Sequence, residues 1–304
     1  MPLRAIPPTE GSPDRLRIGC AMWAHPPWRD RYGIAPGGEL AWYGRRFTTV
    51  EGNTTFYAAP KPETVERWAQ QAPSGMRFCF KLPRHLTHER RLRNIEKPLV
   101  EFLDTLGPLA DRLGPLQVQL PASFGPEDLG VLVDFLDSVV GRTHGLDVEP
   151  AWAVEVRHPE FSPGGRSERL LNDALAARAV NRVILDSRAL FAAPPVTKEE
   201  HEAHAAKPRL PVRPVATGAQ PLIRLIGQSD HEASLRLWRG WFPKLVEWSM
   251  AGATPHVFVH TPDNVDAPEL AIQVWNELRA LSGSELPEIT ALAPVDPTAL
   301  QLDL

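Results

Sequence analysis

Short runs of apolar and β-branched residues recur along the chain, and between them apolar positions follow helical spacing. Short apolar runs bounded by Gly, Pro or polar residues are typical of buried parallel strands. Eight runs are predicted to be strands: 16–20, 48–53, 77–81, 116–120, 152–157, 182–186, 222–226 and 256–260. Eight strands that alternate with helices predict an α/β protein built as a single (β/α)8 TIM-type barrel. A doubly wound sheet is the structural alternative.

The predicted helices rest on apolar residues spaced three and four positions apart. Such stripes occupy residues 62–72, 99–113, 129–140 and 270–281. A further stripe over 235–248 predicts one helix, bent near Pro243 because proline removes a helical hydrogen bond.

Three segments fall outside this alternation. Residues 192–220 are rich in proline and charge, which predicts a long insertion after the sixth strand with at most a short helix. Residues 1–14 and 284–304 are predicted to be N- and C-terminal tails. The barrel is therefore expected to span residues 15–283.

Composition and charge exclude some classes of function. The 304 residues include 33 Lys and Arg against 37 Asp and Glu, so the net charge is −4 and no global basic field is available for wrapping nucleic acid. The chain has neither a signal-peptide pattern nor an apolar run long enough for a membrane span. Its two cysteines, Cys20 and Cys79, lie inside apolar runs and predict a reducing compartment. We expect a cytoplasmic protein without a membrane partner.

Polar and charged residues lie at or near the ends of the predicted strands, where TIM-barrel active sites form. They are Glu51, Asn53, Lys81, Gln119, Glu155, Arg157, Asp186, Arg224 and His260. Because an unpaired buried charge costs several kcal/mol, acids and bases on this many strands predict mutual pairing. Two interpretations follow, an ion-pair network that plugs the barrel or a polar pocket for a ligand, and we favour the pocket.

The loops beyond these strands add two further features. Trp23, Trp28, Phe56 and Tyr57 follow the first two strands and either wall a binding pocket or seal the barrel end against water. Residues 81–93 carry five fixed positive charges against one negative charge. This basic segment is suited to phosphate or carboxylate recognition, and equally to a solvated loop with internal salt bridges.

No motif in the sequence requires a cofactor. A nucleophile elbow, a P-loop, a Gly-x-Gly-x-x-Gly loop and a Cys-x-x-Cys pair are all missing. A divalent metal remains an alternative, with donors from Glu51, Glu155, Asp186, His158 and His260. The neighbouring cationic side chains oppose such a metal site.

Several segments resemble the YecE-like family, also called domain of unknown function 72, which has a TIM-barrel fold. The matching segments are 18–23, 49–57, 80–88, 114–121 and 153–159, with Val50-Glu51-Gly52-Asn53 and Thr55-Phe56-Tyr57 the most specific. The resemblance carries over characteristic polar and aromatic positions at Trp23, Glu51, Asn53, Thr55, Phe56, Tyr57, Lys81, His88, Gln119, Glu155, Arg157 and His158. It implies no reaction. The chain departs from the family pattern at Arg224-Leu225-Ile226-Gly227 and at His260-Thr261.

The leading functional hypothesis is an enzyme, a hydrolase or isomerase, that acts on an anionic small molecule. Its predicted catalytic residues are Glu51, Lys81, Glu155 and Asp186, with a glutamate as general acid or base. Its predicted substrate-binding residues are Trp23, Asn53, Thr55, Tyr57, His88, Gln119, Arg157, His158, Arg224 and His260. The alternatives are a module that binds single-stranded or damaged nucleic acid through residues 81–93, and a metal-dependent hydrolase or isomerase like AP endonucleases or sugar isomerases. The oligomeric state is not predicted.

Overall fold

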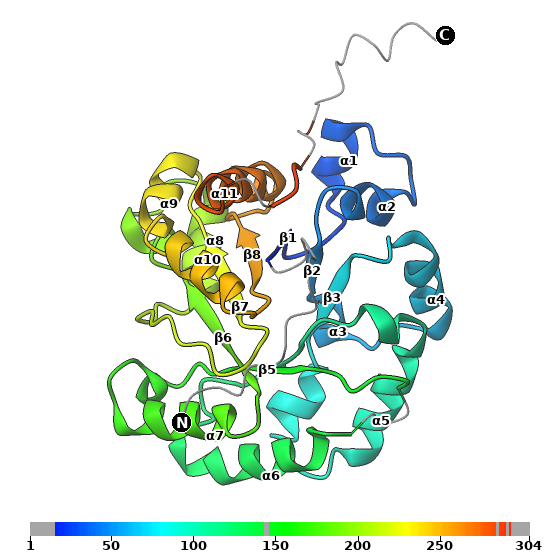
Figure 1. The fold of residues 1–304 in the computed structure, drawn as a ribbon, viewed down its shortest axis with the longest axis vertical. Helices are drawn as coiled ribbons and strands as arrows, with labels where there is room; N and C mark the ends of the chain where they lie inside the picture. The colour runs from blue at the N-terminus through cyan, green and yellow to red at the C-terminus, as the bar shows by residue number, and fades with distance from the viewer. Residues whose placement is uncertain (1–15, 143–145, 284–285, 290–291, 293–304) are drawn as a thin grey trace, which may run out of the picture.

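Parallel strands lie at the centre of the molecule and helices surround them (Figure 1). The structure is a computed structural model, and it describes residues 16–142, 146–283, 286–289 and 292. Within these residues there are eight strands: β1 (Arg17–Cys20), β2 (Thr49–Gly52), β3 (Arg77–Phe80), β4 (Leu116–Gln119), β5 (Trp152–Glu155), β6 (Asn181–Asp186), β7 (Leu222–Ile226) and β8 (His256–His260). Each coincides with a predicted run, so the strand prediction is confirmed.

The strands form two hydrogen-bonded groups. Six of them make one curled parallel sheet in the order β1-β8-β7-β6-β5-β4, and β2 pairs separately with β3, also in parallel. The fold is therefore a mixed α/β fold with a curled half-barrel sheet. In the larger sheet, β5 and β6 share only two residue pairs, whereas β7 and β8 share five.

The side chain of Tyr43 connects β1 to β2. Its hydroxyl accepts a hydrogen bond from Cys20 N (2.6 Å) and donates one to Thr49 O (2.9 Å). Gly19 permits this approach, because a Cβ there would lie 1.8 Å from Thr49 O. The buried Tyr43 hydroxyl thus replaces part of the strand ladder between β1 and β2.

Gln117 has a comparable role between β3 and β4. Its side-chain amide donates to Cys79 O (3.1 Å), and its backbone carbonyl accepts from Leu82 N (2.9 Å). Isolated parallel bridges join Lys81 with Gln117 and Phe78 with Leu113. Both edges of the β2-β3 pair are therefore connected to neighbouring strands, with fewer ladder hydrogen bonds than elsewhere.

Replacing Tyr43 with phenylalanine is expected to lower the free energy of unfolding by about 1–3 kcal/mol, because the buried Cys20 N–H then has no acceptor. Urea denaturation measures the change. The matched control is Tyr57→Phe, since the Tyr57 side chain is 81% exposed and its variant should unfold like the wild type. Equal stability of the Tyr43→Phe variant would contradict the bridging role.

The helices in the described part of the chain are α1 (Pro26–Tyr32), α2 (Glu39–Gly44), α3 (Thr54–Tyr57), α4 (Pro62–Gln71), α5 (Glu96–Thr105), α6 (Leu129–Val139), α7 (Arg166–Ala176), α8 (Lys198–Ala206), α9 (His231–Trp238), α10 (Phe242–Met250) and α11 (Ala267–Leu281). Short helical segments of other types are η1 (His85–Glu89), η2 (Gly107–Arg112), η3 (Pro126–Asp128), η4 (Pro159–Phe161) and η5 (Leu190–Ala192). The single bent helix predicted over 235–248 is wrong. The chain makes two helices there, and Pro243 lies in the first turn of α10, where its missing N–H costs nothing.

The predicted insertion after β6 contains one nine-residue helix, α8, which begins with a capping box between Thr197 and Glu200. The N-terminal tail lies outside the described residues, as do residues 284–285, 290–291 and 293–304 of the C-terminal tail. Of that tail, Leu286 is buried, and Pro287 O accepts a hydrogen bond from Trp275 Nε1 (2.8 Å). No helix among the described residues is long and apolar enough to cross a bilayer.

Alternation along the strands divides their side chains between two faces. On the concave face, Cys79, Ala153, Val183, Leu222 and Phe258 form a small apolar cluster that is separate from the main core under the helices. Residues two positions further along the same strands point to the same face. This cluster is therefore the apolar floor beneath the polar strand ends described next.

Candidate functional site

Six polar side chains lie on the concave face, at or near the carboxyl ends of six strands. They are Glu51, Lys81, Gln119, Glu155, Arg224 and His260, and none is more than 5% exposed. Lys81 directly follows β3, and the other five belong to β2, β4, β5, β7 and β8. The structure thus brings together most of the predicted polar ring, which we call the ionic site.

Arg224 lies at the centre of the ionic site, between two buried carboxylates. Its Nη2 donates to Glu51 Oε2 (3.2 Å), its Nε lies 2.7 Å from Glu51 Oε1, and its Nη1 donates to Glu155 Oε2 (3.1 Å). Burial alone would lower the pKa of Arg224, but the two carboxylates outweigh burial and raise it. One guanidinium therefore joins β2, β5 and β7.

Each carboxylate has a second donor. Asn53 Nδ2 donates to Glu51 Oε2 (2.9 Å), and Arg157 Nε donates to Glu155 Oε1 (2.9 Å). Burial would raise both pKa values, but the cations, Arg224 first, lower the pKa of Glu51 well below its usual range and that of Glu155 to about 2. Both glutamates are therefore ionised at neutral pH, a state unsuited to the general-acid role predicted for one of them.

Lys81 is buried, and no carboxylate among the described residues contacts it directly. Its Nζ donates to the neutral Oε1 of Gln119 (2.8 Å). Burial, followed by the positive charge of Arg224, lowers the pKa of Lys81 to about 8. An amine with such a pKa can give and take protons near neutral pH.

A further cation, Lys207, lies near the ionic site, and sequence reasoning missed it. It follows α8 in the insertion after β6, and its half-buried side chain lies close enough to interact with Arg224, Glu51 and Lys81. Burial and then Arg224 lower the pKa of Lys207 to about 8. No hydrophobic periodicity predicts Lys207 as a site residue, because the path of the insertion depends on tertiary contacts.

The ionic site carries more positive than negative charge. Four cationic side chains, Lys81, Arg157, Lys207 and Arg224, face two carboxylates, those of Glu51 and Glu155. His260 Nε2 lies 3.5 Å from Glu51 Oε2, yet burial and then Arg224 hold its pKa well below 6.5, so His260 is neutral at pH 7. The cluster therefore has a net charge of about +2 that these side chains do not balance.

Aromatic side chains lie beside the ionic site. Phe56 contacts both Tyr57 and His88, with ring centroids 5.3 and 5.1 Å apart, and Tyr57 is 81% exposed. His88 belongs to η1, a π-helical turn of a kind often found at functional sites. Burial and then Arg157 lower the pKa of His88. These three side chains form an aromatic rim, in which Tyr57 is exposed and Phe56 and His88 are half-buried.

The tryptophans of the first loop serve packing instead. Trp23 contacts Trp68 and Phe78, with ring centroids 5.0 and 5.9 Å apart. Trp28 is fully buried, and its Nε1 donates to Asn264 O (3.0 Å) and Val265 O (2.9 Å). The packing of the two tryptophans agrees with the sealing role, and the pocket-wall role of Phe56 and Tyr57 stays a prediction.

Three predicted site residues have other partners. Asp186 does not join the polar ring that the sequence predicted. Val183 points to the concave face of β6, so Asp186, three positions further on, points to the opposite face. Its carboxylate accepts hydrogen bonds from Arg188 and Trp241 instead. His158 Nδ1 accepts from Glu160 N (3.2 Å), which caps η4. Thr55 Oγ1 donates to Lys81 O (2.7 Å) and so holds the backbone that carries the lysine.

The arginines of the basic segment 81–93 are largely engaged within the protein. Arg91 and Arg93 both contact the carboxylate of Asp128, and Arg84 Nη1 lies 3.4 Å from Glu89 Oε1. Arg91 also donates to Ser123 O (3.0 Å). These contacts agree with a loop stabilised by internal salt bridges and leave fewer free cations for a nucleic-acid backbone.

The donor set for a metal is incomplete in the described part of the chain. No three His, Cys, Asp or Glu side chains gather there in a way that could hold a metal ion. Of the five donors that the sequence offered, Asp186 and His158 bond elsewhere, and Arg224 binds both Glu51 and Glu155. These residues do not fit a divalent metal.

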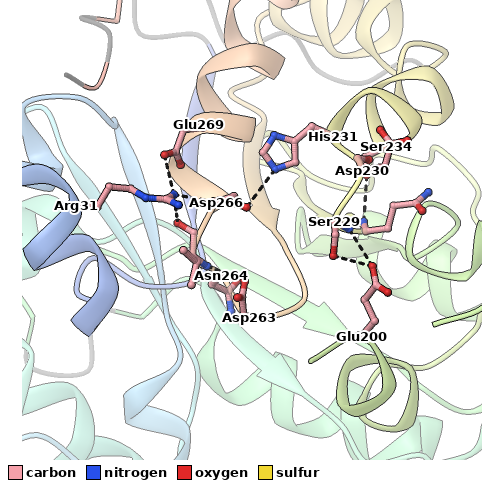
Figure 2. Close-up of polar contacts among 12 residues, drawn as sticks. Arg31, Glu200, Ser229, Asp230, His231, Ser234, Asp263, Asn264, Asp266 and Glu269 are labelled. Atoms are coloured by element: carbon pink, nitrogen blue, oxygen red, sulfur yellow. Dashed lines mark hydrogen bonds and ion pairs between the residues drawn. The ribbon is translucent and has the colours of Figure 1, made fainter. Parts of the chain in front are cut away.

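A second polar network holds the insertion in place (Figure 2). Glu200 of α8 accepts hydrogen bonds from Ser229 Oγ (2.7 Å) and Ser229 N (3.3 Å), in the loop after β7. In the same view, Arg31 contacts Asp266 and Glu269 beyond β8. The Glu200–Ser229 contact fixes α8, and through it the position of Lys207.

Fold and site together define an α/β protein with a buried ionic cluster at the carboxyl ends of parallel strands, the usual ligand position in such folds. The chain belongs to the family described as "Protein of unknown function DUF72", whose model matches residues 17–291. This confirms the resemblance seen in the sequence. The family's description names no activity.

Relatives and solved structures agree with this assignment. The chain is 44% identical over 280 residues to the UPF0759 protein YecE of Escherichia coli K12, covering 92% of this chain and 97% of that one. A DUF72 protein from Enterococcus faecalis has a TM-score of 0.64 at 17% identity, over 93% of this chain and 98% of that one. A DUF72 protein from Thermotoga maritima has a TM-score of 0.61 at 19% identity, over 87% and 99%. At these identities the solved structures support the fold alone.

Proposed function

We propose that this protein is an enzyme that binds a phosphate- or carboxylate-bearing substrate at the ionic site. The observation that carries the proposal is the surplus of positive charge, with Lys81 buried against a neutral amide rather than a carboxylate. Burying unbalanced charge is costly, and an anionic substrate group offsets that cost. Cytoplasmic localisation stays a prediction.

The pairing of the side chains supports a division of roles. Glu51 and Glu155 hold Arg224 in place, and Lys81, Lys207 and Arg157 take the anion. Lys81 is the proton-transfer group, because an amine with a pKa of about 8 populates both protonation states near neutral pH. Tyr57 and His88 contact the remainder of the substrate at the aromatic rim. Proton transfer of this kind suits a hydrolase or an isomerase.

We also propose that all eight strands close into a single (β/α)8 barrel, which forms one domain over residues 15–283. The Tyr43 bridge between β1 and β2 and the Gln117 contacts between β3 and β4 support closure. The insertion 192–220 belongs to this domain, because it supplies Lys207 to the ionic site. A crystal structure in which the β2-β3 pair stands away from β1 and β4 would contradict closure.

Titration with inorganic phosphate, sulfate and small dicarboxylates tests the binding site. We expect at least one of these anions to bind the wild type and raise its melting temperature. Replacing Lys81 with methionine should weaken the binding roughly 30-fold or more, since the loss of a buried charged contact costs about 2–5 kcal/mol. Isothermal titration calorimetry at low ionic strength measures the affinity.

The matched control is Lys244→Met, which removes a lysine whose partner is Glu247 on the surface of α10. This variant should bind anions like the wild type. The proposed function would be contradicted if the Lys81→Met protein bound anions as tightly as the wild type, or if the wild type bound none of the anions tested.

A further inference from the structure

A cavity of about 450 Å³ lies beside the segment that follows β6. Its lining residues are Ser187, Arg188, Phe191, Arg209, Leu210 and Pro211. A volume of this size accommodates a small-molecule ligand. None of these residues belongs to the ionic site, although Leu210 and Pro211 also line a cavity of about 40 Å³ that reaches Glu155. The larger cavity is thus a neighbour of the ionic site.

Arg188 is held in one orientation at this cavity. Its Nη2 donates to Asp186 Oδ2 (2.7 Å) and its Nε to Asp186 Oδ1 (3.0 Å). Asp186 is fully buried, and its Oδ2 also accepts from Trp241 Nε1 (2.7 Å). A buried carboxylate fixed on two sides leaves the guanidinium little freedom. Asp186 is therefore a positioning residue for Arg188.

Arg209 and Phe191 supply a charge and a flat apolar surface. The guanidinium carbon of Arg209 lies 5.7 Å from the centre of the Phe191 ring. Among the residues that the structure describes, no carboxylate forms an ion pair with Arg209. Phe191 in turn packs against His204, with ring centroids 4.7 Å apart, which keeps its ring in place.

A side-chain to backbone hydrogen bond holds the segment that carries Arg209. Ser187 Oγ donates to Pro208 O (2.9 Å), which ties the segment carrying Arg209 to the end of β6. Leu210 and Pro211 add apolar surface. The two arginines face one carboxylate, that of Asp186, so the lining has an excess positive charge. A preformed cavity with two guanidinium groups and an aromatic ring favours an anion that also carries a planar ring.

We infer that this cavity binds a phosphorylated ring compound of the nucleoside monophosphate class. Its phosphate lies between Arg188 and Arg209, and its ring lies against Phe191 and Pro211. Arginine guanidinium groups bind phosphate oxygens through paired hydrogen bonds, and aromatic faces stack on nucleobases. The inference does not depend on the proposed function of the ionic site.

Calorimetric titration with adenosine 5′-monophosphate tests the inference, with adenosine and inorganic phosphate as separate probes. We expect the monophosphate to bind more tightly than adenosine or inorganic phosphate alone. Arg209→Ala should weaken its binding roughly tenfold, since one charge-assisted contact is lost. Phe191→Leu keeps the apolar packing but removes the aromatic ring. It should weaken the binding of the monophosphate and leave the binding of inorganic phosphate unchanged.

Two further variants separate this cavity from the ionic site. Arg236→Ala removes an exposed arginine of α9 that lines neither cavity, and it should bind the monophosphate like the wild type. Lys81→Met should leave the binding of the monophosphate at this cavity unchanged, while it weakens anion binding at the ionic site. Loss of binding in Lys81→Met but not in Arg209→Ala would overturn the inference while supporting anion binding at the ionic site. No binding to the wild type would overturn it outright.

Discussion

Replacing Arg224 with methionine is expected to lower the free energy of unfolding by about 3–5 kcal/mol, because it leaves two buried carboxylates without their shared cation. Glu51 and Glu155 are each at most 1% exposed, so water cannot replace the lost hydrogen bonds. At about 2–4 °C per kcal/mol, the melting temperature should fall by roughly 10 °C. Urea and thermal denaturation measure both quantities.

Arg157→Met is the matched control, because it removes a cation from the same Glu155. The side chain of Arg157 is 24% exposed and that of Arg224 only 3%, so solvent screens the first contact more. We therefore expect a smaller loss, of about 1 kcal/mol. Equal losses in the two variants, or none in either, would show that the central guanidinium does not hold the ionic site together.

Acid is expected to destabilise the protein in two stages. Burial keeps His256 and His260 neutral in the folded state, with pKa values well below 6.5. The unfolded chain therefore binds more protons as the pH falls below about 6.5, and stability decreases. Glu155 follows, because its pKa is 4.5 when unfolded and about 2 when folded. Its contribution, on the order of 3 kcal/mol, is complete above pH 4.5 and is lost as the pH falls towards 2.

Urea denaturation between pH 8 and pH 3.5 measures this profile. We expect the highest stability above about pH 6.5 and a continuous loss below it. Glu101→Gln is the control, since it breaks an exposed ion pair with Lys97 and should leave the shape of the profile unchanged. A flat profile from pH 7 to pH 3.5 would contradict the assigned protonation states.

The strands were predictable because each is a short buried run with clear boundaries. The observed β7 and β8 match the predicted ranges to the residue. Alternation also predicted most of the ionic site, since Glu51, Glu155, Arg224 and His260 lie on the concave face at or near the carboxyl ends of their strands. The single helix predicted over 235–248 was wrong, because a continuous apolar stripe does not reveal the break between Trp238 and Phe242.

The sequence did not predict the positions of Asp186 and Lys207 relative to the ionic site. Asp186 was placed in the ring because it ends its strand, although Val183 on the same strand already takes the concave face and implies the opposite face for Asp186. Lys207 has no signature of its own. It reaches the ionic site because Glu200 bonds Ser229 and Ser187 bonds Pro208, and neither contact can be read from the sequence.

The Tyr43 bridge also bears on how the chain folds. Tyr43 lies 23 residues after Cys20 and six residues before Thr49, whose strands it joins. The first two strands are thus paired by a residue of α2, the second of the two helices between them, so docking of α2 and pairing of β1 with β2 are one event. Contacts this close in sequence form quickly. This unit can assemble early, before β1 meets β8 from the far end of the chain.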